Sequence, residues 1–491
     1  MRSPKKLLRM TCILLPLAAF VSCTLYPRYE RPSLESSDEW RDPLPTDDAV
    51  EISWWKQFQD PVLNELIEEA LLANQDILAA ISRVDQFKAD LGIANSRFYP
   101  QLVGQAAAER QQVSKALKNT SNILFPVFNA LSTVFQPSYY ADIWGEVRSS
   151  SESAYHEWIG SIQARRAVVL AVVTSVASTY VQLRQFDSQL IVSRETLKTR
   201  TEAYNLAKIR HELGLTSLLE VEQAIAEMEI AEVQVEQFQI AIALAENLLS
   251  NLLGQTSKKI PRGLDLNHLS MPPSVPACVP ANIVCQRPDV LAAEERLIAA
   301  NARIGIAWAQ FFPQLNLLGA IGAQSSIASN FFTNAAKVFE IGATVLQEIF
   351  TGGRLTSNVD LADAVKLELL HVYLAAVLTA FQEVNDALTS HKLFLELVQT
   401  QKIRVDATKQ YLYLSNLRYQ EGEVDYLTFL DAERQYFQAQ LDYEETVGNS
   451  FVSYVRIYQA LGGPWVTEAD DEVMKTNPCK VTIEVNCPVT E

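Results

Sequence analysis

The sequence predicts an α+β membrane protein with an internal two-fold repeat, in which pairs of amphipathic strands alternate with very long helices. Three observations predict this fold class. The 29 residues of segment 74–102 recur without gaps at 287–315, with 13 identical positions. Apolar and polar residues alternate after each copy, as in β-strands. Segments of 68 residues with at most one Gly and no Pro then follow, which predicts helices too long for one compact globule.

Composition excludes several classes of function. The 491 residues carry a formal net charge of −17, and 48% of them are hydrophobic. A disordered tail would be less hydrophobic, and a nucleic-acid-binding protein would show a basic stripe, so we expect no nucleic-acid partner. The chain contains no Gly-rich phosphate loop, no Ser-His-Asp order and no Cys/His ligand spacing. We therefore expect neither enzyme activity nor a metal or other cofactor.

The N-terminus has the features of an export signal. Four basic residues precede an apolar run, which predicts a signal peptide over 1–22. The tetrapeptide at 20–23, Phe-Val-Ser-Cys, resembles the lipobox of bacterial lipoproteins, with Phe where Leu is usual. Cys23 would then become the first mature residue and carry N-palmitoyl and S-diacylglycerol groups. The alternative is ordinary cleavage or an uncleaved anchor, with Cys23 incidental. Past residue 22 we expect no transmembrane helix.

Four of the remaining cysteines fall into two closely spaced pairs. In an exported, oxidising setting such pairs suggest two local disulfides. The cysteines concerned are Cys278, Cys285, Cys479 and Cys487.

Each repeat is expected to contain one β-hairpin, 100–117 with 128–145 in the first and 312–327 with 336–351 in the second. Each preceding helix should end at the motif FYPQL or FFPQL, because Pro disfavours helix in the residue before it. The strands are too polar on one side for a dry core and suit an apolar outside with a wet inside. An ordinary half-exposed sheet is the alternative.

Long helices follow both hairpins. The breaker-poor segments 146–213 and 354–421 would each reach about 100 Å if continuous. Gly214 and Gly422 then suit a chain reversal, because Gly accepts a positive φ at little cost. Second helices are expected at 216–253 and 424–461, where frequent Ala, Gln, Glu and Ser indicate thin coiled-coil packing.

Two repeats supply four strands, which are too few to close a barrel. Closure therefore requires other subunits, and three copies would give twelve strands, within the range of outer-membrane barrels. A structural coiled-coil lipoprotein without a pore is the competing class, against which the alternating strands argue.

Nearly the whole mature chain resembles the outer-membrane efflux family, the TolC- and OprM-like channels of tripartite pumps. The resemblance depends on the shared order of several motifs. They are CTLYPRYERP (23–32), WWKQFQDPVLNELIEEAL (54–71), DIWGEVR (142–148), RPDV (287–290), IGIAWAQFFPQL (304–315) and FTGGRL (350–355).

The resemblance implies a homotrimer with a twelve-stranded β-barrel in the outer membrane, continued by a periplasmic α-helical barrel with an equatorial domain at its waist. It divides the chain into a signal peptide (1–22), a lipid-anchored extension (23–58), a first repeat (59–254), an equatorial linker (255–286), a second repeat (287–462) and an equatorial tail (463–491).

The implied function is a passive exit duct for drugs or other small molecules. The implied partners are a periplasmic adaptor (membrane fusion) protein, an inner-membrane transporter and outer-membrane lipid. The lipidated start and NodT-like motifs favour a resistance-nodulation-division (RND) transporter. The exit duct of a type I protein secretion system is the alternative.

The resemblance also implies a gate at the periplasmic tip. Leu427 and Asp431 lie four residues apart, on one helix face. By resemblance they form an apolar constriction and an acidic ring, which would act as a hydrophobic gate and a cation-attracting site. The alternative is a coiled-coil seam residue and a solvated carboxylate.

A second gate element would link the two helical reversals. Glu220 falls where some family members carry an acid that accepts a hydrogen bond from a Tyr, here Tyr419. Val424 replaces an Arg that adds another tether in some members, so the gate is expected to depend mainly on Leu427. The alternative for Glu220 is a solvent-facing carboxylate.

Overall fold

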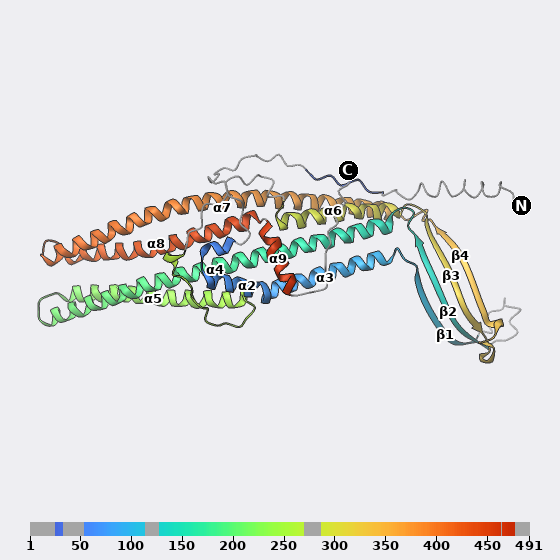
Figure 1. Ribbon diagram of the computed structural model, residues 1–491, viewed down its shortest axis with the longest axis horizontal. Coiled ribbons are helices and arrows are strands. Elements are labelled where there is room, and N and C mark those ends of the chain that lie inside the picture. Colours follow the sequence, from blue (N-terminus) through green and yellow to red (C-terminus); the bar gives the residue numbers. More distant parts are fainter. Residues whose placement is uncertain (1–24, 33–53, 113–126, 270–285, 463, 477–491) are drawn as a thin grey trace. The chain divides into compact units, whose positions relative to one another are not determined.

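The computed structural model describes residues 25–32, 54–112, 127–269, 286–462 and 464–476 (Figure 1). These residues belong to two compact units. The first comprises Met1–Ser33, Val84–Ser161 and Ala293–Tyr373, and the second comprises Leu34–Arg83, Ile162–Ala292 and Leu374–Glu491. Several predicted features lie outside the described residues: the signal peptide 1–22, Cys23, Cys278, Cys285, Cys479 and Cys487.

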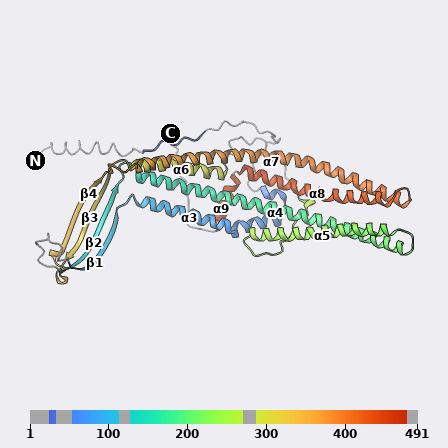
Figure 2. The ribbon, with the colours of Figure 1, turned by 180° about the vertical axis from the view of Figure 1, so that it is seen from behind.

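The four predicted strands form one antiparallel sheet in the first unit, in the order β1-β2-β3-β4. The strands are β1 (Gln101–Gln112), β2 (Val127–Ala141), β3 (Gln314–Ser325) and β4 (Lys337–Leu346). Strands β2 and β3 pair directly, with Phe135 opposite Ile321, so the hairpins of the two repeats form one continuous sheet. Figure 2 shows the same four strands side by side from behind. β1 and β4 are its two edges.

One face of this sheet is apolar across neighbouring strands. The register places Leu315 opposite Val345, Leu317 opposite Ala343, and Ile321 opposite Phe339. These side chains share a face because successive residues of a strand alternate between faces. The opposite face carries polar residues such as Asn316, Thr344 and Glu340. An apolar face with exposed Ile341 (77%) and Phe339 (71%) is what a lipid-facing barrel wall requires.

The strands end earlier than the sequence predicts. β2 ends at Ala141 instead of 145, and β4 at Leu346 instead of 351. The φ angles of Gly145 (79°), Gly352 (59°) and Gly353 (87°) are positive and incompatible with a strand, so the chain turns there into the next helix. The end of the first predicted strand, 113–117, lies outside the described residues.

The four long helices predicted with both bounds, 146–213, 216–253, 354–421 and 424–461, match within two residues at each end. The longer helices of the structure are α3 (Gln75–Ser96), α4 (Glu146–Glu212), α5 (Leu218–Leu252), α6 (Pro288–Ala309), α7 (Arg354–Gln420) and α8 (Tyr426–Leu461). Shorter helices are η1 (Trp54–Phe58), α2 (Pro61–Ala73), η2 (Leu266–His268), η4 (Ala328–Asn330), η5 (Asn334–Ala336) and α9 (Pro464–Thr476). Within the second unit, α5 runs back along α4, and α8 along α7 (Figure 2).

Helices α4 and α7 have 67 residues each and contain an 18-residue window apolar enough to cross a membrane. This qualifies the expectation that no such stretch follows residue 22. A single span needs only about 20 residues, and in α4 61% of the window is buried inside the subunit. Length and composition alone therefore do not make either helix a membrane span.

Aromatic side chains gather where segments distant in sequence meet in the second unit. Trp54 is fully buried, stacks on Tyr458 at 5.1 Å between ring centroids, and meets Trp465 edge-on at 6.0 Å. Asp60, also fully buried, accepts hydrogen bonds from the Tyr180 hydroxyl (2.8 Å) and the Leu264 backbone N–H (3.1 Å). Residues of the N-terminal extension, the linker and the tail thus pack together against the helices of this unit, and their assignment to an equatorial domain stays a prediction.

Arg165 of α4 and Asp470 of α9 form a buried bidentate pair, with N–O distances of 2.7 and 2.5 Å. We expect Asp470→Asn to lower the free energy of unfolding by about 3–5 kcal/mol, because it leaves the Arg165 guanidinium buried without its counter-charge. Thermal unfolding in detergent, followed by circular dichroism, measures this. The neighbouring Asp471 is exposed, so Asp471→Asn is the matched control. Equal melting temperatures for both variants would contradict the prediction.

Candidate channel gate

Each helical reversal is built on a glycine. Gly214 (φ 72°) and Gly422 (φ 75°) take the left-handed conformation, and the following backbone N–H closes the turn over the preceding helix. At the second reversal Asp425 caps α8, because its carboxylate accepts hydrogen bonds from the Thr428 backbone N–H (3.0 Å) and hydroxyl (2.6 Å). These bonds lower the pKa of Asp425. The cap fixes the start of α8 and thereby the position of Leu427.

The structure places Leu427 and Asp431 one turn apart on an exposed face of α8, as predicted. Leu427 is 53% exposed, which argues against a seam position inside the subunit. Asp431 accepts a hydrogen bond from the Gln435 side chain at 2.7 Å. Below it, Gln438 donates to Asp442 at 2.7 Å, so a polar row continues along this face. The role of both residues as a gate stays a prediction.

Glu220 and Tyr419 line one cavity of about 180 Å³ between the two reversals, together with Arg210, Tyr426 and Phe429. The expected hydrogen bond between them is absent here: Glu220 accepts one from Thr216, and Tyr419 is hydrogen-bonded to Arg210. Thr216 lies in the reversal just before α5 and Glu220 in its first turn, so this hydrogen bond stays within one reversal. Burial, with a contribution from the Glu220 charge, raises the pKa of Tyr419.

Three aromatic rings form part of the cavity wall. Tyr419 stacks on Phe429 with 5.7 Å between centroids, and Tyr426 lies 5.5 Å from Tyr419. These rings join the end of α7 to the start of α8. Val424, which replaces the Arg of some family members, is partly exposed. The two reversals are therefore in contact through packing and Arg210, while the predicted Tyr419–Glu220 tether is not formed.

An ionic cluster that the sequence did not predict lies behind the exposed face, and all of it except Arg434 (51% exposed) is largely buried. Arg200 of α4 is 2% exposed and donates from Nε to Glu433 of α8 at 3.0 Å. Its Nη1 donates to the Glu227 carbonyl of α5 at 2.8 Å and lies 3.2 Å from Glu227 Oε2, an ion-pair contact without hydrogen-bond geometry. Arg434 donates to the other Glu227 oxygen at 2.5 Å. We call these four residues the inter-helix clasp.

The clasp connects the hairpin formed by α4 and α5 to α8 of the other hairpin. The Arg200 guanidinium also lies 5.2 Å from the Phe437 ring centroid, a cation–π contact. Each charge by itself resembles a solvated helix residue, so no local sequence pattern reveals the cluster. A buried carboxylate between two guanidinium groups is stable only while all partners are in place.

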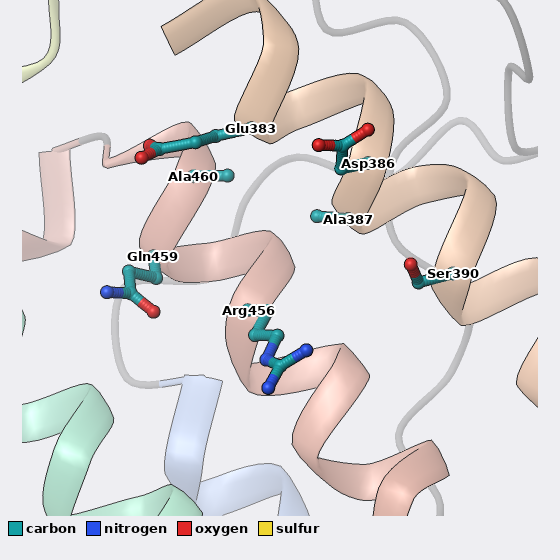
Figure 3. A pocket seen from close by; sticks show the side chains of 7 residues that line it. All are labelled: Glu383, Asp386, Ala387, Ser390, Arg456, Gln459 and Ala460. Atoms are coloured by element: carbon teal, nitrogen blue, oxygen red, sulfur yellow. The ribbon is translucent and has the colours of Figure 1, made fainter. Parts of the chain in front are cut away.

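A second polar cavity, of about 230 Å³, lies between α7 and α8 (Figure 3). Figure 3 shows Glu383 and Asp386 of α7 and Arg456 of α8 on its wall. Arg287, the first residue of the motif RPDV, is 5% exposed; it lies 2.7 Å from Glu383 and donates to the Ala460 carbonyl at 2.8 Å. Burial disfavours the charged form of Arg287, but its hydrogen bonds to carboxylates outweigh this and raise the pKa of Arg287. Arg287 thus joins three helices.

The sheet and helices together define a class of protein. A four-stranded sheet with one apolar and one polar face cannot remain open in lipid, where every backbone polar group needs a partner. Helices about 100 Å long are suited to spanning a compartment outside the bilayer. The subunit is that of an outer-membrane channel with a long helical extension.

Comparisons with known proteins identify the family. The family model described as "Outer membrane efflux protein" matches residues 66–255 and 279–463. The chain is 34% identical over 474 residues to the toluene efflux pump outer membrane protein TtgC of Pseudomonas putida, covering 93% of this chain and 96% of that one. It is 30% identical to the cation efflux system protein CusC of Escherichia coli, with coverages of 92% and 99%. The chain belongs to the outer membrane efflux protein family.

A solved structure agrees with this assignment. The open state of the Neisseria gonorrhoeae MtrE outer membrane channel superimposes with a TM-score of 0.79 at 28% identity, covering 90% of this chain and 98% of that one. The predicted fold class, an α+β membrane protein of the trimeric outer-membrane channel type, is confirmed, as is the outer-membrane location. The chain is the outer-membrane channel of an efflux system. These matches support efflux over protein secretion, and the relatives are efflux proteins rather than enzymes.

Proposed function

We propose that this chain forms a homotrimeric, lipid-anchored duct through which drugs or other small molecules leave the cell. The observation that carries the proposal is the sheet itself. It has one apolar face, one polar face and two edge strands, β1 and β4. Three copies place β4 of one subunit beside β1 of the next and close a twelve-stranded barrel around a wet lumen.

The exposed side of α7 supports the same assembly. Only 17% of its apolar window is buried within the subunit, and Leu361 (64%), Leu367 (54%) and Leu378 (60%) are exposed. Large apolar side chains left exposed in this number on one helix are typical of an interface. Packing against a neighbouring subunit would remove these leucines from water. Trimer migration on a gel, converted to monomer by heating, tests the assembly. A single monomeric band without heating would contradict it.

The duct itself supplies no energy, so we propose that it works with a periplasmic adaptor and an inner-membrane RND transporter that selects the substrate. Relatives are named for toluene and cation efflux, which shows that one channel architecture serves different cargoes. Co-purification of the tagged channel from membranes, followed by identification of the associated proteins, tests the partners. Recovery of a protein-secretion transporter instead would favour the other class of exit duct.

The gate would consist of three Leu427 side chains facing one another, with three Asp431 carboxylates one turn away. The clasp holds α8 in place on the subunit side, so that opening requires α8 to move against α4 and α5. An apolar ring excludes hydrated ions, and an acidic ring attracts cations. The two disulfides, Cys278 with Cys285 and Cys479 with Cys487, stay predictions.

Lipidation at Cys23 has its own test. We expect Cys23→Ser to abolish incorporation of labelled palmitate, because the serine hydroxyl cannot take the thioether-linked diacylglycerol that precedes signal cleavage. Cys12→Ser, within the signal peptide, is the matched control and should label normally. Continued labelling of Cys23→Ser would place the lipid elsewhere.

A further inference from the structure

The sheet contains four charged residues, and its two faces divide them by sign. Lys337 of β4 shares the apolar face with Phe339, two residues further along the strand. Arg110 of β1 lies on the same face, as the register from β1 through β2 to β3 shows. Glu109 and Glu340 point to the opposite, polar face. Within the described strands, the lipid-facing side therefore carries two positive charges and no negative one.

Both cations lie at the end of the sheet that is not joined to the helices. Lys337 is the first residue of β4, and Arg110 is the third from the end of β1. The long helices continue from the other ends of the strands, so this end faces the outer leaflet of the membrane. A cation on the lipid-facing side of a barrel is costly at the midplane of the bilayer but costs little at its interface with water. Both side chains are exposed, and neither forms an ion pair with another described residue.

An apolar hollow of about 400 Å³ lies beside Arg110 on the same face of the sheet. Ala106 and Ala108, which precede Arg110 on this face of β1, form part of its floor. Phe331 and Phe332, from the connection between β3 and β4, form its wall. Alanine side chains are short, so they leave room above the strand for an apolar chain. Ala108 and Arg110 lie only about 7 Å apart along the strand, which places a positive charge at the edge of the hollow.

Lys337 lies on the other side of the hollow. The register places Lys337 in one row with Ala106, three strand spacings or about 14 Å away. Arg110 lies one pleat beyond Ala108, toward the end of β1. The two charges thus border the hollow on two sides, an arrangement that suits a headgroup with two separated phosphate groups.

The wall of the hollow is a folded connection with an exposed aromatic surface. The Ser325 hydroxyl donates to the Ile327 carbonyl at 2.7 Å and accepts from the Ile327 backbone N–H at 3.1 Å. The rings of Phe331 and Phe332 meet edge-on, 5.2 Å apart between centroids. Phe332 is 94% exposed. Contact with hydrocarbon is more favourable for such a side chain than contact with water, so this wall suits an acyl chain.

We propose that this end of the sheet binds a phosphorylated lipid of the outer leaflet, with an acyl chain in the hollow and the phosphates on Arg110 and Lys337. The headgroup supplies the negative charge that the lipid-facing side lacks. A guanidinium donates two hydrogen bonds to a phosphate, and a lysine ammonium pairs with it as a point charge. The hydrocarbon of the same molecule covers Phe331 and Phe332. The site goes beyond the proposed function, because it lies within one subunit and involves neither the gate nor the pump partners.

Titration of the purified channel with lipid A, followed by native mass spectrometry, tests the site. Lipid A is the phosphorylated glycolipid of bacterial outer leaflets, and its dephosphorylated form is the comparison. We expect the parent to bind lipid A about tenfold more tightly than the dephosphorylated form. Arg110→Gln with Lys337→Gln should weaken lipid A binding by roughly 20-fold, because each cation near a membrane surface contributes about fivefold. Phe331→Ala with Phe332→Ala should weaken the binding of both lipids.

Glu109→Gln is the matched control, because it removes the neighbouring charge from the opposite face and should leave both affinities unchanged. Arg110→Lys keeps the positive charge and should lose no more than about twofold. Equal lipid A affinity in the parent and the double cation variant, or equal affinity of the parent for both lipids, would overturn the proposal. Parent-like affinities of the phenylalanine variant would overturn the acyl-chain site. A monomeric band on the gel would count against the trimer alone, since each subunit contains the whole lipid site.

Discussion

Replacing Leu427 and Asp431 together by Ala is expected to raise the single-channel conductance in planar bilayers by about tenfold. Leu427 is exposed on α8, and in the proposed gate the trimer would bring three such side chains to one level of the pore. Removing an apolar ring lowers the barrier to hydrated ions, and each 1.4 kcal/mol corresponds to roughly a factor of ten in rate. Asp431→Asn alone should reduce cation selectivity with a smaller change in conductance.

The matched control for the gate is Leu215→Ala. Leu215 is 73% exposed and lies in the other reversal, between α4 and α5, where the gate proposal assigns it no role. The conductance of the Leu215→Ala channel should equal that of the parent channel. An unchanged conductance of the Leu427 and Asp431 double variant would remove both residues from the gate.

Arg200→Ala is expected to destabilise the packing between the two hairpins by about 3–5 kcal/mol, because it leaves the Glu227 and Glu433 carboxylates without their shared cation. Since the clasp joins α4, α5 and α8, its loss should also raise the open probability of the channel. Hydrogen exchange at the start of α8 measures the first effect, and bilayer recording measures the second. The region should exchange faster in the variant than in the parent.

Two further variants distinguish the effect of losing the clasp from nonspecific destabilisation. Arg404→Ala breaks an ion pair with Asp442 whose side chains are 43% and 28% exposed, so it should cost less than about 1 kcal/mol. Replacing Arg200 by Met together with Glu227→Gln and Glu433→Gln removes all three buried charges and should recover most of the stability. Parent-like exchange in Arg200→Ala would show that the clasp does not hold the hairpins.

The helices and strands of the fold could be predicted because each has a recognisable residue pattern within its own segment. The alternating residues of 337–350 specify a strand with two unlike faces, and the absence of breakers in 354–421 specifies one long helix. Gly214 and Gly422 reverse the chain because their φ angles are positive, a property of the residue itself. Strand ends were less predictable, since they depend on turns such as Gly352–Gly353.

The candidate site was predictable only in part. The spacing of Leu427 and Asp431 places them on one helix face whatever surrounds the helix. The partner of Glu220 was not predictable, because Thr216 and Tyr419 are both chemically suitable and only the packing of α5 against its neighbours decides between them. The clasp could not be predicted from the sequence for the same reason, because only the packing of the helices decides which charged residues meet.

The sequence by itself determined the repeat, the hairpins, the long helices and their reversals, because these follow from residue periodicity and backbone preference over a few residues. The tertiary structure decided which charges are buried together: Arg200 with Glu227 and Glu433, and Arg165 with Asp470. Such pairs form between segments up to 305 residues apart. Their energy comes from removing charges from water at a specific contact, and that contact exists only after the helices have packed.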